Sequence, residues 1–274
     1  MSTEYDYEFK ETLIKIDNVS LSFDDKLILK PISIEVKDIV RPGYCQGQVL
    51  GILGCSGVGK SQLAKILTGL NTPTTGFVTV NGKLVEAGMV GYVAQNYPLF
   101  NHRTVMGNLL VSLEHCNITK QAAKDRVMEY LIRFDLQDKV NYYPCNLSGG
   151  QKQRVSIIQE LLCSEHYLVM DEIFTGQDPI NKDKTCELIN QVANLHEENT
   201  IFVIAHDISA LVSISDTLWL LGRDRDEKNN IIPGAYIKKQ YNLIERGLAW
   251  RKNISMTREF ADTVAEIKSE FKNL

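Results

Sequence analysis

The sequence predicts an α/β fold with a mostly parallel sheet, and three features of the chain lead to that prediction. Short, continuous apolar runs, typical of strands buried on both faces, recur at 48–53, 89–95, 166–172, 200–207 and 217–222. A block of helical periodicity separates the second of these runs from the third. The N-terminal part alternates apolar and polar residues instead, which predicts a small antiparallel β-subdomain.

Two segments predict the N-terminal β-subdomain. Residues 13–23 ("LIKIDNVSLSF") alternate and are rich in β-branched side chains, so we expect an edge strand there, with 29–36 as its antiparallel neighbour. The next segment, 37–47 ("KDIVRPGYCQG"), is polar and contains Pro42-Gly43, which predicts a loop before the first buried strand.

The helical block predicts an inserted α-helical subdomain at about 96–163. Its three helical segments are expected at 104–115, 119–134 and 151–163. Because buried strands flank the block on both sides, the helices interrupt a single α/β core.

The C-terminal part predicts one further strand and a last helix. The strand is expected at 235–241 ("AYIKKQY"), and the helix at 257–271, where apolar residues follow helical spacing. We therefore expect one large domain over residues 1–240 and a C-terminal helical extension over 241–274.

Composition narrows the class of protein. The 274 residues are 44 % hydrophobic, and 30 basic residues stand against 34 acidic ones, which gives no footprint for binding nucleic acid. The acidic start does not resemble a secretory signal, and the longest apolar runs fall far short of the roughly 18–20 residues that span a bilayer. Six cysteines without CxxC pairs suggest reduced thiols rather than disulfides. We expect a soluble protein, or one that a partner holds at a membrane.

A phosphate-binding loop is predicted at "GCSGVGKS" (54–61). The segment fits G-x-x-x-x-G-K-[ST] and lies between a predicted strand and a helix. Its glycines let the backbone wrap around phosphates; Lys60 is expected to neutralise phosphate charge, and Ser61 to ligate Mg²⁺. A glycine-rich turn that matches by chance is the alternative. The residues expected to bind nucleotide are Gly54, Cys55, Ser56, Gly57, Val58, Gly59, Lys60 and Ser61.

Two carboxylates follow the apolar run "YLVMDE" (167–172). The carboxyl end of a buried strand lies beside the phosphate loop, so Asp171 is expected to hold Mg²⁺ there. Glu172 is then placed to orient and polarise the attacking water as general base. A solvated acidic turn is the alternative, but the buried strand and the phosphate loop together favour the catalytic interpretation.

Two other strands deliver polar side chains to the same edge. The run "TIFVIAHD" ends at His206, whose imidazole could hydrogen-bond the γ-phosphate. Gln95 ends the earlier strand and could contact Mg²⁺ or water. Either residue alone is more often structural, so both assignments depend on their neighbours.

A second candidate phosphate site lies at "LSGGQKQR" (147–154), which opens a helix. The first N–H groups of a helix lack intrahelical partners, and the helix dipole favours negative charge there. Ser148, Gly149, Gly150 and Gln151 are therefore candidate phosphate contacts about ninety residues beyond the first loop.

With these motifs in this order, the chain resembles the nucleotide-binding subunits of ATP-binding cassette (ABC) proteins over nearly its whole length. The resemblance implies a P-loop NTPase core and identifies residues 54–61 as Walker A and 167–172 as Walker B. It identifies "LSGGQ" as the family signature, a pattern that ordinary P-loop enzymes lack. By the same resemblance Gln95 belongs to the Q-loop, and His206 is the switch histidine.

Two further residues take roles from the resemblance. Asp178 stands where the family has its D-loop aspartate, and Phe23 where an aromatic side chain stacks on adenine. A core role is the alternative for Phe23. The chain departs from the family at Ile173, where a proline usually follows Walker B, and in the long segment before the Walker A strand.

The resemblance also implies how the two phosphate sites are used. In this family two subunits pair head to tail, and each signature covers the ATP held by the other subunit's Walker A. We therefore expect a homodimer around two ATP molecules with Mg²⁺, in which Ser148, Gly149 and Gly150 act in trans.

The expected function is that of the ATP-hydrolysing subunit of an ABC transporter, which drives separate transmembrane permease subunits. Residues 97–110 resemble the stretch that receives a permease's coupling helix, with subdomain core as the alternative. The chain would then lie peripherally on the cytoplasmic face of the cell membrane. Its C-terminal part resembles the nitrate, sulfonate and taurine importer ATPases. The alternative is a soluble ABC ATPase that serves assembly, defence or regulation.

Overall fold

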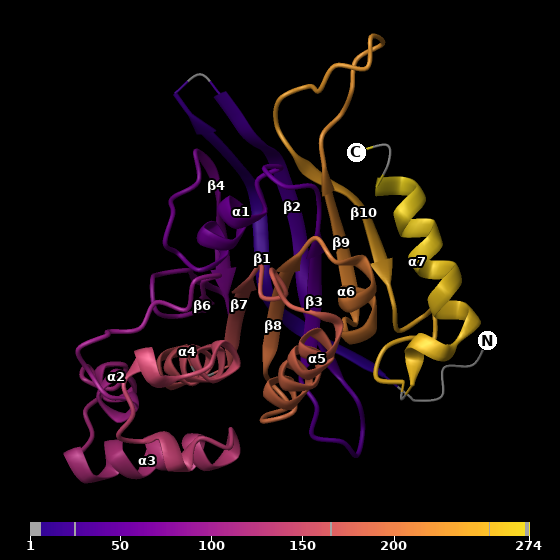
Figure 1. Ribbon diagram of the computed structural model, residues 1–274. Coiled ribbons are helices and arrows are strands. Elements are labelled where there is room, and N and C mark those ends of the chain that lie inside the picture. Colours follow the sequence, from indigo (N-terminus) through magenta and orange to yellow (C-terminus); the bar gives the residue numbers. More distant parts are fainter. Residues whose placement is uncertain (1–6, 25, 165, 252, 272–273) are drawn as a thin grey trace.

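The computed structural model describes residues 7–24, 26–164, 166–251, 253–271 and 274. The first six residues of the acidic start lie outside this part of the chain. Two sheets form the frame (Figure 1): one of six strands, in the order β10-β9-β3-β8-β7-β6, and one of four strands, in the order β2-β1-β4-β5.

The six-stranded sheet contains the predicted buried strands. Five neighbouring strands are parallel, and only β10 runs antiparallel, against β9. Crossover connections between parallel strands are long, which leaves room for the helices on both faces. The strands are β3 (Gln48–Leu53), β6 (Gly91–Val93), β7 (Tyr167–Asp171), β8 (Thr200–Ala205), β9 (Thr217–Gly222) and β10 (Tyr236–Asn242).

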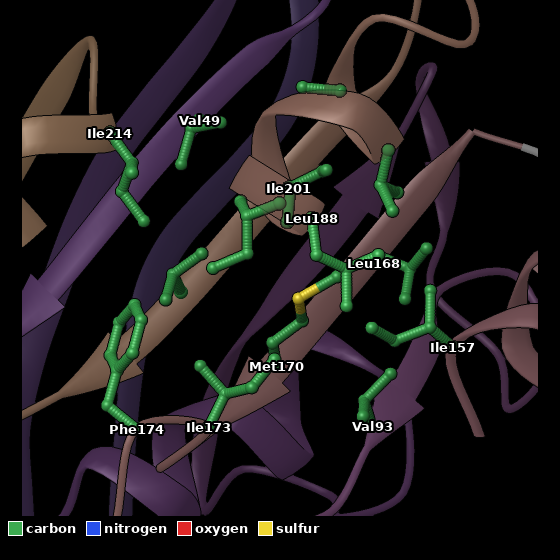
Figure 2. Packing of buried hydrophobic residues seen from close by; sticks show 14 of the residues in the cluster. Val49, Val93, Ile157, Leu168, Met170, Ile173, Phe174, Leu188, Ile201 and Ile214 are labelled. Carbon is green, nitrogen blue, oxygen red and sulfur yellow. The ribbon is translucent and has the colours of Figure 1, made fainter. Parts of the chain in front are cut away.

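Alternate residues of each central strand enter different cores. In β7, Leu168 and Met170 belong to one hydrophobic cluster, whereas Tyr167 and Val169 belong to another. The period of two residues along a strand explains this division. Figure 2 shows the first cluster, in which Leu168 and Met170 lie among side chains from neighbouring strands and helices.

Seven α-helices are present in the described part of the chain. Helix α1 packs in the second cluster together with the antiparallel sheet, and the other helices contribute to the first. Figure 1 places α2, α3 and α4 on one side of the molecule, and α7 on the other, beside β10. The helices are α1 (Lys60–Leu67), α2 (Val105–Val111), α3 (Lys120–Arg133), α4 (Gly149–Ser164), α5 (Pro179–Ala193), α6 (Ile208–Ile214) and α7 (Arg258–Phe271).

The antiparallel sheet is larger than the sequence predicted. It consists of β1 (Glu8–Phe23), β2 (Lys26–Val40), β4 (Thr75–Val80) and β5 (Lys83–Leu84). Strands β4 and β5 were not predicted, although Asn81-Gly82 between them is a hairpin signal. Both residues have positive φ, 49° and 74°, as a tight two-residue hairpin turn requires.

The predicted loop at 37–47 is wrong in its first four residues. Strand β2 continues through Val40 because β1 extends beyond its predicted start, and Glu8 and Phe9 pair with Val40 and Ile39. Ile39 is buried against Ile244, which compensates for the polar neighbours. The loop begins at residue 41.

The helical insertion and the C-terminal helix occur where the sequence placed them. Helices α2, α3 and α4 lie within residues 96–164, and α7 packs on α6 through buried Val264 and Ile267. The proposed boundary at residue 240 falls inside β10, so the division into domain and extension stays a prediction. Helices α5 and α6 were not predicted. In the described part of the chain, no helix has the length and apolar character needed to cross a bilayer.

We expect Leu168→Ala to lower the free energy of unfolding by about 2–5 kcal/mol, because it opens a cavity between the central strands and the helices. Leu168 is 1 % exposed. The matched control is Leu84→Ala, at 63 % exposure, which should change stability by no more than about 0.5 kcal/mol. Urea unfolding followed by circular dichroism measures both, and equal losses would contradict the proposed core.

Candidate functional site

The predicted phosphate loop joins β3 to α1. Gly57 and Gly59 have φ of 73° and 119°, in the region that favours glycine, and Gly59 is the N-cap residue of α1. A Cβ at Gly54 would lie 2.7 Å from the Leu221 carbonyl oxygen of β9. The glycines therefore allow a tight loop packed against the sheet, with the first N–H groups of α1 at its centre.

Lys60 is buried at the start of α1, and its ammonium group is held from two sides. Its Nζ donates to the carbonyl oxygens of Gly54, at 2.8 Å, and Cys55, at 3.2 Å. It also lies 3.1 Å from Glu172 Oε1. The ammonium thus links the phosphate loop to the end of β7.

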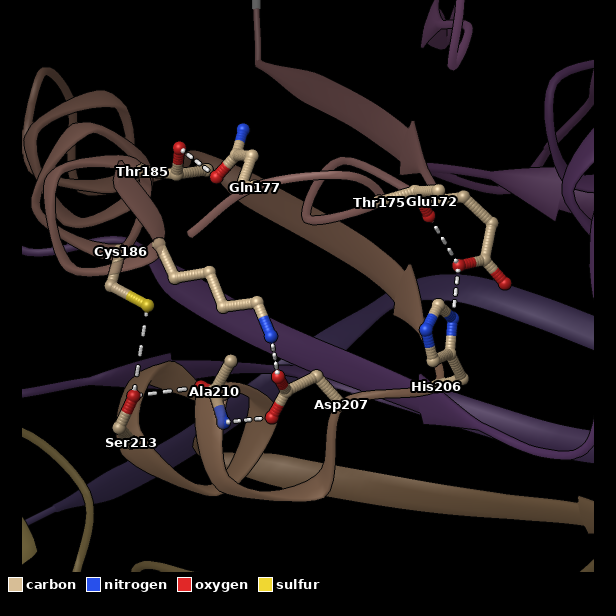
Figure 3. A network of polar contacts seen from close by, with 10 residues as sticks. Glu172, Thr175, Gln177, Thr185, Cys186, His206, Asp207, Ala210 and Ser213 are labelled. Atoms are coloured by element: carbon tan, nitrogen blue, oxygen red, sulfur yellow. Dashed lines mark hydrogen bonds and ion pairs between the residues drawn. The ribbon is translucent and has the colours of Figure 1, made fainter. Parts of the chain in front are cut away.

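Glu172 follows β7 and connects three elements of the site. Besides the pair with Lys60, its Oε2 lies 2.8 Å from His206 Nδ1 and accepts a 3.2 Å hydrogen bond from Thr175 Oγ1. Figure 3 shows Glu172 between His206 and Thr175. The residue has a φ of 51°, an uncommon conformation for a non-glycine residue, and its N–H donates to Ile204 of β8. The neighbouring strand therefore holds the backbone that aims this carboxylate.

Opposing effects act on the pKa of Glu172. Burial is the largest and raises the pKa, but the hydrogen bond from His206 and the charge of Lys60 outweigh it, so the pKa lies below its ordinary value. The carboxylate is ionised at neutral pH, as a general base requires.

Asp171 ends β7 with one satisfied and one unsatisfied carboxylate oxygen. Tyr92 of β6 donates its hydroxyl to Oδ2 at 2.8 Å. Burial and, to a lesser extent, this carboxylate raise the pKa of Tyr92, which keeps the phenol a donor. Oδ1 is buried and has no hydrogen-bond partner among the described residues. A buried carboxylate oxygen of this kind fits a cation ligand.

A cleft of about 510 Å³ brings most of the predicted nucleotide residues together. Ser61 and Gln95 line it, and Phe23 lies at it with 45 % of its surface exposed. An exposed aromatic side chain here suits base stacking better than a core role. The other predicted residues that line the cleft are Ser56, Gly57, Gly59, Lys60, Glu172 and His206.

Three predicted loop residues do not line this cleft. The side chain of Val58 is buried in the second core, and its N–H donates to Cys55 within the loop. Gly54 and Cys55 contribute the carbonyl oxygens that hold Lys60. Their part in nucleotide binding therefore stays a prediction.

The signature residues lie in a different cleft. This second cleft, of about 580 Å³, is lined by Ser148, Gly149, Gly150 and Gln151, and shares Gln95 and Thr175 with the first. Ser148 and Gln151 form a reciprocal cap at the start of α4: Ser148 N–H donates to Gln151 Oε1 at 2.9 Å, and Gln151 N–H donates to Ser148 Oγ at 3.3 Å. Within one chain, the signature residues do not line the cleft of the phosphate loop.

The two glycines of the signature face open space in the described part of the chain. Outside the backbone of its own helix, a Cβ at Gly149 or at Gly150 would meet no described atom within 4 Å. Glycine here leaves open space over the first turn of α4, where something outside the described chain can approach the backbone.

Three functional candidates were missed in the sequence. Lys26, Thr175 and Arg223 also line the first cleft, and Arg223 donates to the carbonyl oxygen of Gly57 at 2.7 Å. Arg223 directly follows β9, so the strand-end argument used for Glu172 could have found it. Lys26 starts a strand of the other sheet, and no sequence motif places it here.

The segment after Walker B accommodates its departure from the family. Ile173, in place of proline, is buried next to Phe174 in the first core (Figure 2). Asp178, the predicted D-loop residue, caps α5 by accepting from the Asn181 N–H at 3.0 Å. The buried side chains of Ile173 and Phe174 thus anchor this turn in the core.

The chain resembles known ATP-binding proteins in sequence. A family model described as "ABC transporter" matches residues 43–175. The "Methionine import ATP-binding protein MetN" of Pasteurella multocida is 30 % identical over 264 residues, which cover 93 % of this chain and 75 % of that protein. The chain belongs to the ABC transporter ATPase family. The predicted class of ATP-binding, ATP-hydrolysing protein is thereby confirmed.

A second curated relative carries the same name, and two solved structures share the fold. The MetN protein of Photorhabdus laumondii is 39 % identical over 186 residues, and the chain spans 54 % of its length. The solved structure of cbiO1 from Clostridium perfringens, part of the ABC transporter complex cbiONQ, has a TM-score of 0.72 at 22 % identity and covers 96 % of this chain and 100 % of that one. The ATP-binding cassette MJ0796, with ADP and Pi, has a TM-score of 0.67 at 22 % identity and covers 84 % and 99 %. The predicted α/β fold class is confirmed.

We expect His206→Gln to raise the pKa of Glu172, because burial remains while a charge-stabilising partner is lost. The ¹³Cδ shift of Glu172, followed from pH 2 to 7, measures the change. His102→Gln, at an exposed position away from the cleft, is the control and should leave the titration unchanged.

The pKa of Glu172 also makes the stability of the fold depend on pH. Because the pKa of Glu172 is lowered by folding, its contribution is present above the unfolded-state pKa and is lost as pH falls through the folded value. In His206→Gln the folded pKa lies closer to the unfolded one, so the acid-dependent loss of stability should be smaller than in the wild type. A loss of equal size in the two proteins contradicts the coupling.

Proposed function

We propose that this chain is the ATP-hydrolysing subunit of an ABC importer, that two copies close head to tail around two ATP molecules, and that they drive a separate transmembrane permease. The observation that carries the proposal is the meeting of Lys60, Glu172, His206 and Gln95 in one cleft, with the signature in another. We place the triphosphate held by a second copy of the chain in this second cleft.

Nucleotide binding releases the general base. In the structure, the Lys60 ammonium is shared between loop carbonyl oxygens and Glu172. A triphosphate in the loop carries more negative charge than one carboxylate, so it draws the ammonium away from Glu172. Glu172 then keeps His206 and Thr175 as partners and has one oxygen, Oε1, for a water molecule. Lys60 therefore couples phosphate binding to activation of the base.

The donor set fits Mg²⁺. Asp171 Oδ1, next to the cleft residue Glu172 in sequence, is a buried carboxylate oxygen without a partner among the described residues, and Ser61 and Gln95 line the first cleft with oxygen atoms. We propose that these three residues hold the ion directly or through water. Bound there, Mg²⁺ would neutralise charge on the β- and γ-phosphates.

The signature is proposed to bind the γ-phosphate of the other copy. Its helix begins with two glycines that leave room for a phosphate to approach the backbone closely. Asp178 and the exposed Ile180 follow Walker B and lie close in sequence to residues that line the signature cleft, so we place them near the contact between copies.

We propose a membrane permease as the partner of this chain and a small nutrient molecule as the cargo. Relatives named for methionine import support an importer, and a permease would hold the chain peripherally on the cytoplasmic face of the membrane. Methionine is one candidate cargo; nitrate, sulfonate or taurine are others, from the resemblance of the C-terminal part. Co-purification with membrane subunits supports transport, whereas purification with soluble partners alone supports an assembly, defence or regulatory ATPase.

We expect Phe23→Ala to weaken ATP binding about 5- to 150-fold, since stacking on a base contributes roughly 1–3 kcal/mol. Phe77→Ala is a matched control, because Phe77 is similarly exposed, at 43 % against 45 %, but lies outside the cleft. Fluorescence titration with a labelled ATP analogue measures both. Equal affinities of the two variants would remove Phe23 from the adenine site.

We expect Glu172→Gln to lower ATP hydrolysis by about 10²–10⁴-fold while leaving ATP bound, because it removes the base and keeps the shape of the side chain. With ATP and Mg²⁺ this variant should elute as a dimer in size exclusion chromatography. Adding Ser148→Arg should restore the monomer by filling the signature cleft. Ser255→Arg, at an exposed serine near α7, is the control and should remain dimeric. Dimers that persist with Ser148→Arg contradict binding by the signature in trans.

A further inference from the structure

A cluster of potential metal ligands lies at the edge of the six-stranded sheet opposite the nucleotide cleft. His166 directly precedes β7, and Glu198 lies two residues before β8, its parallel neighbour. The amino ends of the two strands are joined where Thr200 N–H donates to the His166 carbonyl oxygen at 2.9 Å. Since β7 has five residues, the cluster lies roughly 17 Å from Glu172. It is therefore separate from the ATP site.

The donor set contains two imidazoles and one carboxylate. Ligand atoms of His166, His196 and Glu198 all lie within 4.8 Å of one another. His166 Nε2 is 3.5 Å from Glu198 Oε2, and the two imidazole rings have centroids 4.5 Å apart. Nitrogen and oxygen ligands on a tetrahedral Zn²⁺ are roughly 3.3 Å apart, given metal–ligand distances of about 2.0–2.1 Å. The pair of His166 and Glu198 already has nearly this separation.

A buried asparagine orients His166 as a ligand. Asn199 is 3 % exposed; its Nδ2 donates to the Val192 carbonyl oxygen at 2.8 Å, which leaves its Oδ1 as an acceptor. That oxygen lies 3.1 Å from His166 Nδ1 and can accept the Nδ1 proton, so Nε2, which faces Glu198, is the ring nitrogen available to a metal ion. Metal-bound histidines in proteins are commonly held in this way by a hydrogen bond to the other ring nitrogen.

The surroundings of the cluster are acidic. Burial raises the pKa of Asp38 in β2, and the nearby carboxylates of Glu11, Glu198 and Glu197 raise it further, against a lowering by Lys10. Several negative charges therefore act on one small region, which favours a bound cation.

We propose that His166, His196 and Glu198 bind one first-row divalent transition metal ion of the Zn²⁺ type. Two imidazole nitrogens favour such an ion over Mg²⁺ or Ca²⁺, which prefer oxygen. His196 and Glu198 are exposed, so rotation of their side chains brings the third ligand into place. His196 Nδ1 then gives up the 3.3 Å hydrogen bond that it accepts from the Glu198 N–H. The ion would tie the start of β7 to the turn that precedes β8.

The test is titration of the chain, prepared without a polyhistidine tag, with ZnCl₂ in an isothermal calorimeter. The background carries His206→Ala, so that the nucleotide site does not contribute a ligand. We expect one saturable site and, with CoCl₂, a visible absorption band from nitrogen coordination. His196→Ala and Glu198→Gln should each weaken binding by at least about ten-fold. Circular dichroism checks that each variant is folded.

The matched control is the double variant His102→Ala, His115→Ala, which removes two exposed histidines outside the cluster. It should bind Zn²⁺ as the background does. A second measure is the melting temperature, which should rise on addition of Zn²⁺ in the background and in the control, but not in His196→Ala. The proposal is overturned if the background shows no saturable binding, or if His196→Ala and the control bind equally.

Discussion

The ion pair between Lys60 and Glu172 is the contact on which the rest of the site depends. Lys60 begins the helix after β3, and Glu172 follows β7, so the pair spans the intervening strand β8. One carboxylate also reaches His206, which follows β8. Three strand ends are thereby held by one charge cluster. These contacts require the carboxyl ends of β3, β8 and β7 to lie side by side. The pairing of the three strands places them so.

The two cores explain why the ends of these strands are so well placed. Each central strand sends alternate side chains into opposite clusters, and both clusters are closed by helices or by the antiparallel sheet. A shift of one residue would exchange the two sets of side chains, so burial fixes the register strongly. Precision at the polar edge is therefore a product of apolar packing several residues away, and not of contacts within the site alone.

Much of this arrangement could be predicted, because it depends on local patterns. The apolar run at 48–53 coincides with β3, and its neighbours at 167–171 and 200–205 lie inside their predicted ranges. The rule that parallel strands present their carboxyl ends at one edge then predicts that Glu172 and His206 lie close together.

The features that could not be predicted depend on contacts between residues that are far apart in the sequence. Strand β2 extends to Val40 because its last residues pair with Glu8 and Phe9 of β1. No pattern within residues 37–40 predicts this extension. Helix α5 has a largely polar sequence with a weak apolar pattern. Its buried face is recognised only from its packing in the folded chain. Arg223 binds the loop carbonyl of Gly57 across 166 residues of chain, a contact that no motif encodes.

The cap at the start of α4 has a consequence for association. Ser148 and Gln151 satisfy each other's backbone groups, so the first turn of the helix is held in place by the chain itself. Little conformational entropy remains to be lost at this surface on binding. Two side chains of the signature thus keep the start of α4 rigid, and a partner that binds there does not have to order it first.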